Sequence, residues 1–233
     1  MVSSTNTYAT ELARNGAADG TLVITDEQPA GRGRVGRSWR SLPRQQVLLS
    51  LVLRPVFPAQ FLVMAAALAV AGGIADAADL RPDIKWPNDV LHHGRKLCGI
   101  LIETGASDAD GPFAVLGIGI NINGTLANDP DLAGRAATLA DAVGHDVSRE
   151  EIAVAVLKRL DALYTLLRGG GEAAQRHVQN EWRARLVTLG KQVEIDQGGD
   201  RVAGLAEDVD AGGALLLRRP NGDLRTIFWG DVR

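Results

Sequence analysis

Apolar residues recur along the chain in two patterns, one typical of buried strands and one typical of packed helices. Short runs rich in Val, Leu and Ile, bounded by Gly, Pro or charged residues, predict strands. They lie at residues 21–26, 46–54, 83–87, 97–103 and 113–122. Longer runs predict helices at residues 6–15, 59–78, 149–167 and 172–186. Because hairpin turns rather than regular crossovers join several strands, we expect an α+β fold with a mixed sheet.

The most apolar segment, residues 61–78, is rich in alanine and contains Gly72 and Gly73. This composition favours a packed core helix over a membrane span. The first eight residues lack the basic and apolar regions of a secretory signal, and the one cysteine, Cys98, permits no internal disulfide. We therefore expect a cytoplasmic protein without a membrane partner.

After Leu189 and Gly190 the pattern changes to short strands separated by glycine-containing turns. This change predicts a small all-β domain at residues 187–233, following a first domain at residues 1–186. A domain of about 45 residues is near the lower limit for independent stability. We therefore expect it to pack against the first domain.

Positive charge is concentrated in one segment, although the whole chain of 233 residues has a net charge of −3. Residues 31–75 contain no Asp or Glu but six arginines, three of them in the run Gly-Arg-Gly-Arg-Val-Gly-Arg-Ser-Trp at residues 31–39. Glycine lets a ligand approach the backbone closely, and arginine offers a planar fork of donors for carboxylate or phosphate. We call residues 31–39 the Gly-Arg loop and predict that it binds an anion.

The Gly-Arg loop also matches the pattern G-x-G-x-x-G of dinucleotide-binding proteins. That motif requires a helix after the third glycine and an acidic residue about 20 positions later. Ser38 and Pro43 make a poor helix start here, and the next acidic residue is Asp76. A dinucleotide oxidoreductase is therefore a weak hypothesis.

Three later segments also carry candidate chemistry. Lys85-Trp86-Pro87-Asn88-Asp89 places a cation, an amide and a carboxylate around a rigid corner. These groups suit a triphosphate with Mg²⁺, although an Asx-turn after proline is the structural alternative. Lys96 enters an apolar strand, which favours an anionic partner unless the ammonium stays exposed. In the segment 117–123, alternating Gly and Ile leave one strand face open, with Asn121 on the glycine side.

Taken in order, these segments resemble the catalytic domain of biotin protein ligases over nearly the whole chain. The matching segments are Ser4-Thr5-Asn6, Gln28 to Trp39, Lys85 to Asp89, Lys96 to Glu103 and Gly117 to Asn121. The resemblance implies an α+β domain of the biotin/lipoate ligase and class II synthetase type, followed by a small SH3-like β-barrel. It also implies a form without an N-terminal DNA-binding domain, because the first motif lies at the start of the chain.

The reaction implied by the resemblance has two steps. Biotin and Mg-ATP give biotinyl-5′-AMP and pyrophosphate, and a lysine of a biotin carboxyl carrier domain of an acyl-CoA or pyruvate carboxylase then takes the biotinyl group. Arg34 and Lys96 are the expected catalytic residues, because each can neutralise the biotin carboxylate and the α-phosphate. Mg²⁺ is expected at Asn88 and Asp89 through the phosphates.

The binding residues follow from the same resemblance. Those expected for biotin are Ser4, Thr5, Asn6, Gln28, Gly31, Arg32, Gly33, Arg34, Lys96 and Gly99. Those expected for ATP are Arg34, Arg37, Trp39, Lys85, Asn88, Asp89 and Asn121.

Two alternatives to biotin ligation stay open at this point. A ligase for lipoate or another acyl group would share the fold and a lysine. A non-enzymatic small-molecule-binding regulator would need a basic recognition helix to bind DNA, and residues 149–186 carry mixed charge instead. We therefore expect no DNA partner, while the sequence leaves open whether the protein is a monomer or a homodimer.

Overall fold

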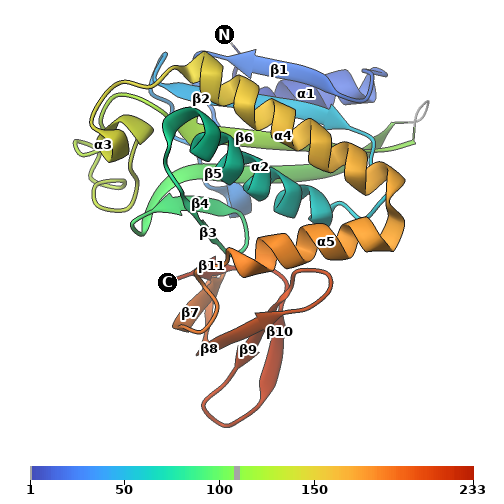
Figure 1. Cartoon of the computed structure of the whole chain (residues 1–233), viewed down its shortest axis with the longest axis vertical. Helices are drawn as coiled ribbons and strands as arrows, with labels where there is room; N and C mark the ends of the chain where they lie inside the picture. Colours follow the sequence, from blue (N-terminus) through green and yellow to red (C-terminus); the bar gives the residue numbers. More distant parts are fainter. Residues whose placement is uncertain (1, 108–110) are drawn as a thin grey trace.

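Two antiparallel sheets and a layer of helices make up the protein, shown in Figure 1. The computed structural model describes residues 2–107 and 111–233. The larger sheet has the strand order β1-β2-β6-β5-β4-β3. Its strands are β1 (Thr21–Thr25), β2 (Gln46–Leu53), β3 (Asp83–Lys85), β4 (Asp89–His92), β5 (Arg95–Ser107) and β6 (Gly111–Asn121).

The expected α+β fold is confirmed. The expectation that the sheet would contain both parallel and antiparallel strands is wrong. Every pairing between the strands of the larger sheet is antiparallel across the described residues. The physical reason is connectivity, because β3, β4, β5 and β6 follow one another in both sequence and space, and short turns join antiparallel neighbours. Parallel pairing occurs only at two isolated bridges, Ile84 with Leu186 and Lys96 with Ala136.

The four predicted helices are present, and each of their ends lies within two residues of the expected position. They are α1 (Thr5–Arg14), α2 (Gln60–Ala78), α4 (Arg149–Gly169) and α5 (Gly171–Ala184). A short helix, α3 (Leu139–Val143), was not predicted. It begins with a capping box in which the Thr138 hydroxyl accepts from the Asp141 amide and the Asp141 carboxylate accepts from the Thr138 amide.

Helix α2 is buried on nearly all sides, between the larger sheet and helices α4 and α5. Its length and composition would suit a membrane span, but 72 % of its most apolar window is buried inside the protein, as the sequence predicted for a core helix. Gly72 and Gly73 let α4 approach closely, because a β-carbon at Gly73 would lie 2.7 Å from the Val156 amide nitrogen.

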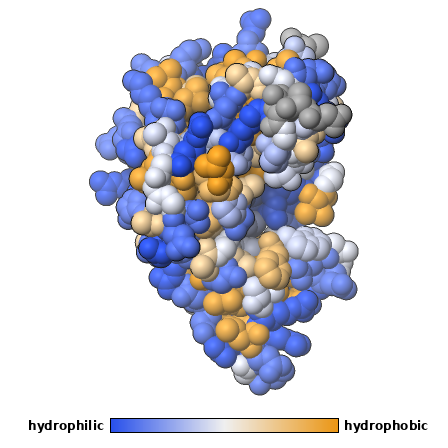
Figure 2. Space-filling view, turned by 90° about the vertical axis from the view of Figure 1, so that its right-hand side faces the viewer, coloured by the Kyte–Doolittle hydropathy of each residue, from blue (hydrophilic) through white to orange (hydrophobic). Residues whose placement is uncertain are grey.

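On the face seen in Figure 2, hydrophobic residues form scattered groups among hydrophilic ones.

The two faces of the larger sheet have different roles. On one face, alternate residues of β2 and β6, such as Leu49 and Ile118, join the main core with α2 and α4. On the other face, Val52 and Val115 pack against α1 in a smaller cluster. Farther along the strands, α1 no longer covers this second face, and the candidate site lies there.

The C-terminal segment forms the second, five-stranded sheet, with the order β10-β9-β8-β7-β11. Its strands are β7 (Gln192–Gln197), β8 (Asp200–Val209), β9 (Leu215–Arg218), β10 (Leu224–Ile227) and β11 (Asp231–Val232). It packs against the first domain, since the Trp86 indole donates to the Gly213 carbonyl at 2.9 Å. This contact confirms the expected packing, while the boundary at residue 187 stays a prediction.

Candidate active site

A cleft of about 520 Å³ opens on the second face of the larger sheet. Its walls come from parts of the chain that are far apart in sequence. These are the start of α1, the Gly-Arg loop, the turn between β3 and β4, strands β5 and β6, residues 131–136 and strand β11. The cleft therefore contains nearly all the residues singled out in the sequence.

The Gly-Arg loop forms a tight hairpin at the edge of this cleft. The Trp39 amide donates to the Gly31 carbonyl at 2.9 Å, and the Gly33 amide donates to the Arg37 carbonyl at 2.7 Å. Gly31 is not among the residues that line the cleft, and its expected role in biotin binding stays a prediction. It is required by the hairpin, because a β-carbon there would lie 2.7 Å from the Trp39 carbonyl oxygen.

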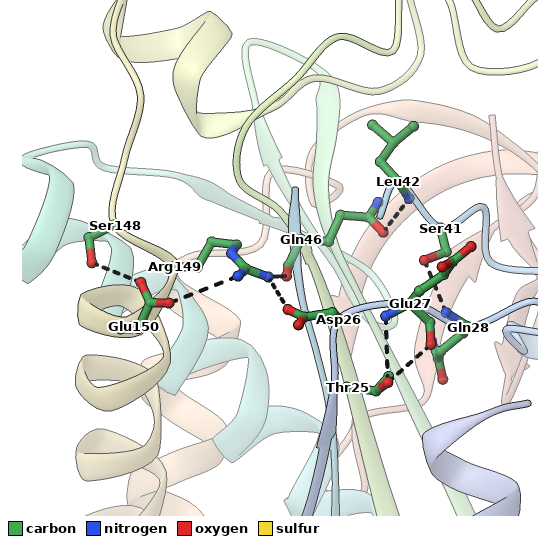
Figure 3. A network of polar contacts seen from close by, with 10 residues as sticks. All are labelled: Thr25, Asp26, Glu27, Gln28, Ser41, Leu42, Gln46, Ser148, Arg149 and Glu150. Atoms are coloured by element: carbon green, nitrogen blue, oxygen red, sulfur yellow. Dashed lines mark hydrogen bonds and ion pairs between the residues drawn. The ribbon is translucent and has the colours of Figure 1, made fainter. Parts of the chain in front are cut away.

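A polar network fixes the segments on either side of this loop, as Figure 3 shows. Arg149, at the start of α4, donates to Asp26 at 2.7 Å and to the Gln46 carbonyl at 3.3 Å. This ion pair lowers the pKa of the Asp26 carboxyl below its ordinary value. The end of β1 and the start of β2 are thereby held together, so the hairpin emerges from a fixed base.

One end of the cleft is lined by a network of mostly neutral groups, which we call the neutral end. Ser4, Thr5, Asn6 and Gln28 line the cleft there, and Ser50 and Glu103 are bonded to Thr5 and Asn6 from behind. Gln28 Oε1 accepts from the Thr5 amide at 2.7 Å and from the Thr5 hydroxyl at 3.0 Å. The Ser50 hydroxyl lies 2.7 Å from Thr5 Oγ1 and 2.6 Å from Asn6 Oδ1. These bonds hold donors and acceptors in place before any ligand arrives.

Ser4 precedes α1 at the N-cap position, but its side chain makes no capping hydrogen bond. Its hydroxyl lines the cleft instead. Asn6 is oriented from the other side, because its amide donates to Glu103 at 3.0 Å. Glu103 also pairs with Arg32 at 2.7 Å, which connects the neutral end to the Gly-Arg loop.

Glycines on β5 and β6 leave room above the sheet for side chains from other elements. A β-carbon at Gly117 would lie 2.0 Å from Asn6 Oδ1, and one at Gly119 would lie 2.7 Å from the Trp39 ring. The Trp39 indole thus lies over Gly99 and Gly119, which pair across the two strands. The predicted open strand face is present, and its glycines are needed for close approach.

The opposite end of the cleft, which we call the charged end, contains Arg34, Lys85, Asn88, Asp89, Lys96 and Arg135. Arg34 donates to Asn88 Oδ1 at 2.8 Å, and the Asn88 amide donates to the Ile100 carbonyl at 2.7 Å. Asn88 is therefore used to join the loop to β5 rather than in an Asx-turn. Lys96 pairs with the Asp89 carboxylate at 2.6 Å. The sequence predicted a carboxylate or phosphate of a ligand as its partner, and that contact stays a prediction.

Two cations of the charged end are destabilised by their surroundings. Burial lowers the pKa of the Arg34 guanidinium below its ordinary value, while the carboxylates of Asp231 and Asp89 oppose this shift. Burial also lowers the pKa of Lys85, and the neighbouring cations Lys96 and Arg135 lower it further, while the carboxylates of Asp89 and Asp231 oppose this shift. Concentrated, partly buried positive charge of this kind is characteristic of anion-binding sites.

The charge balance of the whole cleft points to the same kind of ligand. Eight arginines and lysines line it but only three carboxylates, although the chain as a whole carries a net charge of −3. The second sheet contributes to the cleft as well, because Asp231 of β11 pairs with Arg37 of the Gly-Arg loop. An excess of cations in a cleft attracts polyanionic ligands and raises their local concentration.

Mg²⁺ was expected at Asn88 and Asp89. The side chains present could hold the ion only together with phosphate oxygens of a bound nucleotide. Asn88 Oδ1 already accepts from Arg34, which leaves the Asp89 carboxylate as the available oxygen donor. Within the part of the chain that the structure describes, no group of three or more His, Cys, Asp or Glu side chains could hold a metal. One carboxylate with water and phosphate oxygens is a usual arrangement for Mg²⁺, so the ion would be held mainly by the nucleotide.

The structure places the remaining expected residues in the cleft, while their roles stay predictions. Asn121 and Trp39 line it, as do Arg32, Gly33 and Gly99. The Asn121 side chain accepts from Gln46 at 2.8 Å and donates to the Lys96 carbonyl at 3.3 Å. Its orientation is therefore fixed by β2 and β5, which it joins.

Sequence reasoning missed Ser50, Gln46 and Glu103 as members of the site. Ser50 is fully buried and Gln46 is 1 % exposed, in a strand whose other residues are all apolar. A polar side chain inside such a strand is costly unless it is bonded, so this pattern was a usable signal. Glu103 belongs to one of the motif segments, but only the fold shows that it contacts Asn6 and Arg32.

Comparison with known proteins agrees with these motifs. Residues 1–121 match the model of the biotin/lipoate A/B protein ligase family, and residues 188–232 match the biotin protein ligase C-terminal domain. A biotin–[acetyl-CoA-carboxylase] ligase of Mycobacterium tuberculosis is 38 % identical, over 98 % of this chain and 85 % of its own length. The bifunctional ligase/repressor BirA of Bacillus subtilis is 36 % identical, over 100 % of this chain and 71 % of its own length.

Solved structures agree in fold. The biotin protein ligase of Aquifex aeolicus, solved in complex with biotin and ATP, superposes with a TM-score of 0.82 at 26 % identity. That match covers 100 % of this chain and 94 % of the other. Sequence motifs, domain order and fold lead to the same conclusion: this chain belongs to the biotin/lipoate A/B protein ligase family and carries the C-terminal domain of biotin protein ligases.

Proposed function

We propose that this protein is a biotin protein ligase, an enzyme that activates biotin with ATP and transfers it to a lysine of a biotin carboxyl carrier domain. The observation that carries the proposal is the division of one cleft into a neutral end and a charged end. A neutral ring system with a carboxylate tail suits the first, and a nucleoside triphosphate suits the second. Relatives named biotin–[acetyl-CoA-carboxylase] ligases, and a neighbour solved with biotin and ATP, support the same assignment.

In the first step, a carboxylate oxygen of biotin attacks the α-phosphorus of ATP, a P–O bond forms and pyrophosphate leaves. Both reactants are anions, so their repulsion is part of the barrier. Lys96 and Arg34 lie at the charged end, and either can neutralise charge where the two reactants meet. When bound, Mg²⁺ would neutralise part of the charge on the phosphates. Asp89 holds the Lys96 ammonium at 2.6 Å, and Asn88 holds the Arg34 guanidinium at 2.8 Å.

In the second step, the neutral amine of the acceptor lysine attacks the carbonyl carbon of the mixed anhydride. An amide bond forms, AMP leaves with the bonding electron pair, and the nitrogen loses a proton to solvent. The anhydride is sensitive to water, so closure of the Gly-Arg loop over it would protect the intermediate. Because Arg149 holds Asp26 and Gln46 together, such a closure would move the Gly-Arg loop relative to a fixed base.

Ligation of lipoate is the second candidate function, because the family includes lipoate ligases. The bonded network at Thr5, Asn6 and Ser50 favours biotin, since a ring rich in polar atoms can use these fixed groups. A dithiolane ring has no such atoms and could not use the remaining donor and acceptor sites of these groups.

A biotin-dependent exchange of labelled pyrophosphate into ATP tests the proposal. The exchange should require both biotin and Mg²⁺, and labelled biotin should then appear on a carrier domain but not on the same domain with its target lysine changed to arginine. Exchange that proceeds equally well without biotin would contradict the proposal. So would lipoate supporting the exchange better than biotin does.

The location and the partners of the proposed enzyme are inferred from the sequence. We propose a cytoplasmic location and an acceptor domain belonging to acyl-CoA or pyruvate carboxylases. DNA and membranes are not expected as partners. A homodimer stays compatible with the exposed edge strand β1, where Ile24 is 56 % exposed.

A further inference from the structure

The loop that follows β6, residues 124–136, brings one more cation into the cleft. Arg135 lines the cleft together with Lys85 and Lys96, and it was not among the residues singled out by sequence motifs. Its side chain is exposed. In the described part of the chain, the structure records no hydrogen bond or ion pair for the guanidinium.

Most other cations of the cleft have a carboxylate partner. Arg32 pairs with Glu103, Arg37 with Asp231, Lys96 with Asp89 and Arg233 with Asp196. Arg40 reaches both Asp129 and Asp131. Among the described residues, Lys85 has no such partner, and Arg34 contacts an amide rather than an acid. Arg135 and Lys85 are therefore the two cations left available to a ligand.

The backbone of Arg135 is fixed beside Lys96 on both sides. The Lys96 amide donates to the Arg135 carbonyl at 2.8 Å, and the Ala137 amide donates to the Lys96 carbonyl at 3.0 Å. The Arg135 amide in turn donates to the Leu132 carbonyl at 2.9 Å. The base of the side chain is therefore held in a defined place, as a binding residue requires.

Arg135 and Lys85 also interact electrostatically. Each raises the free energy of the other in the empty cleft, because two like charges share a partly buried region. The positive charge of Arg135 is one of the causes that lower the pKa of Lys85. A bound polyanion would relieve this repulsion, so the arrangement is stabilised by ligand rather than by the protein alone.

We propose that Arg135, together with Lys85, binds the terminal phosphates of ATP and the pyrophosphate product. This inference rests on the proposed function and extends it to a residue that the motifs do not include. Lys96 and Arg34 act where the carboxylate meets the α-phosphate, so the two unpaired cations serve the leaving group. Arg135 is thus a binding residue for pyrophosphate and contributes nothing to biotin binding.

Calorimetry with inorganic pyrophosphate and with AMP tests this inference on the full-length protein. Arg135→Gln should weaken pyrophosphate binding about tenfold, the usual effect of losing one charge-assisted hydrogen bond. AMP contains only the α-phosphate, so its affinity should change less than twofold. Arg135→Lys should restore part of the pyrophosphate affinity. In adenylate formation, the KM for ATP should rise while the KM for biotin stays constant.

Arg95→Gln is the matched control, because it removes one positive charge next to Lys96 from a side chain that does not line the cleft. Equal losses of pyrophosphate affinity in the two variants would overturn the inference and indicate a general charge effect. Equal losses for AMP and pyrophosphate in Arg135→Gln would overturn it as well. A native protein that binds pyrophosphate but forms no biotinyl-AMP would contradict the proposed function and leave this subsite standing.

Discussion

The two ends of the cleft solve different problems of recognition. At the neutral end, Thr5 donates to Gln28, and the Ser50 hydroxyl bonds to both Thr5 and Asn6, so the polar groups are oriented in the empty protein. At the charged end, Lys85 and Arg135 are left without partners among the described residues, and burial disfavours the charge of Lys85. A neutral ring is therefore recognised by groups already in place, whereas a polyanion is recognised by positive charge that has no ion-pair partner in the empty protein.

Removing Lys96 should have the largest effect, because it lies where the two ligands meet. Lys96→Ala should lower kcat for adenylate formation about 100- to 1,000-fold, the usual effect of losing a group that stabilises transition-state charge. Quenching the reaction at set times and detecting biotinyl-AMP would measure this rate. Lys158→Ala, which removes an exposed lysine of α4, should match the native rate. A loss of less than tenfold in Lys96→Ala would contradict a catalytic role.

Removing the Ser50 hydroxyl should affect the neutral end alone. In Ser50→Ala, Thr5 and Asn6 lose a hydroxyl that lies within 2.7 Å of both, so the KM for biotin should rise about tenfold. The KM for ATP should stay within twofold of the native value. Thr21→Ala, which removes a hydroxyl at the exposed end of β1, is the control. Equal changes in both KM values would show that the two ends are not independent.

The charged end should respond to pH through Lys85. Because its pKa is lowered, Lys85 loses its charge at a lower pH than an ordinary lysine does as the pH rises. The KM for ATP should therefore begin to rise at a lower pH than expected for a free lysine. Lys85→Arg keeps its charge and should shift that rise to higher pH. Identical pH profiles in the two proteins would exclude Lys85 as the titrating group.

The smallest of the predicted effects is that of salt, which should change the KM for ATP more than the KM for biotin. Raising the ionic strength from about 0.05 M to 0.5 M screens exposed charges, so the KM for ATP should rise several-fold. The KM for biotin should change less than the KM for ATP, since biotin carries a single carboxylate and its ring is held by neutral hydrogen bonds. Measuring both constants in one salt series provides an internal control. A parallel rise of both would contradict the division of the cleft.

Local patterns in the sequence predicted much of this arrangement. The apolar runs gave the buried strands and helices, and the glycines at residues 117 and 119 predicted the open strand face. The cost of burying an ammonium predicted an anionic ligand beside Lys96; the structure shows the Asp89 carboxylate next to it, and the ligand contact stays a prediction. These features depend on residues that are close in the sequence, or on the free-energy cost of burying a single polar side chain.

The features that the sequence did not predict depend on contacts between distant segments. Ser50 contacts Thr5 and Asn6 across about 45 positions, and Glu103 contacts Arg32 from another strand. The local motif also did not show that the hairpin itself needs glycine at position 31, where the chain passes close to Trp39. Arg135 was missed because only the backbone bonds to Lys96 bring its loop into the cleft.

The most direct test of the account is mass spectrometry of the small-molecule product after incubation with Mg-ATP and an equal mixture of biotin and lipoate. The account predicts biotinyl-AMP from the native protein and a strongly reduced amount from Lys96→Ala. Lipoyl-AMP as the only product would contradict the role given to the neutral end. The absence of any acyl-adenylate from the folded protein would contradict the account as a whole.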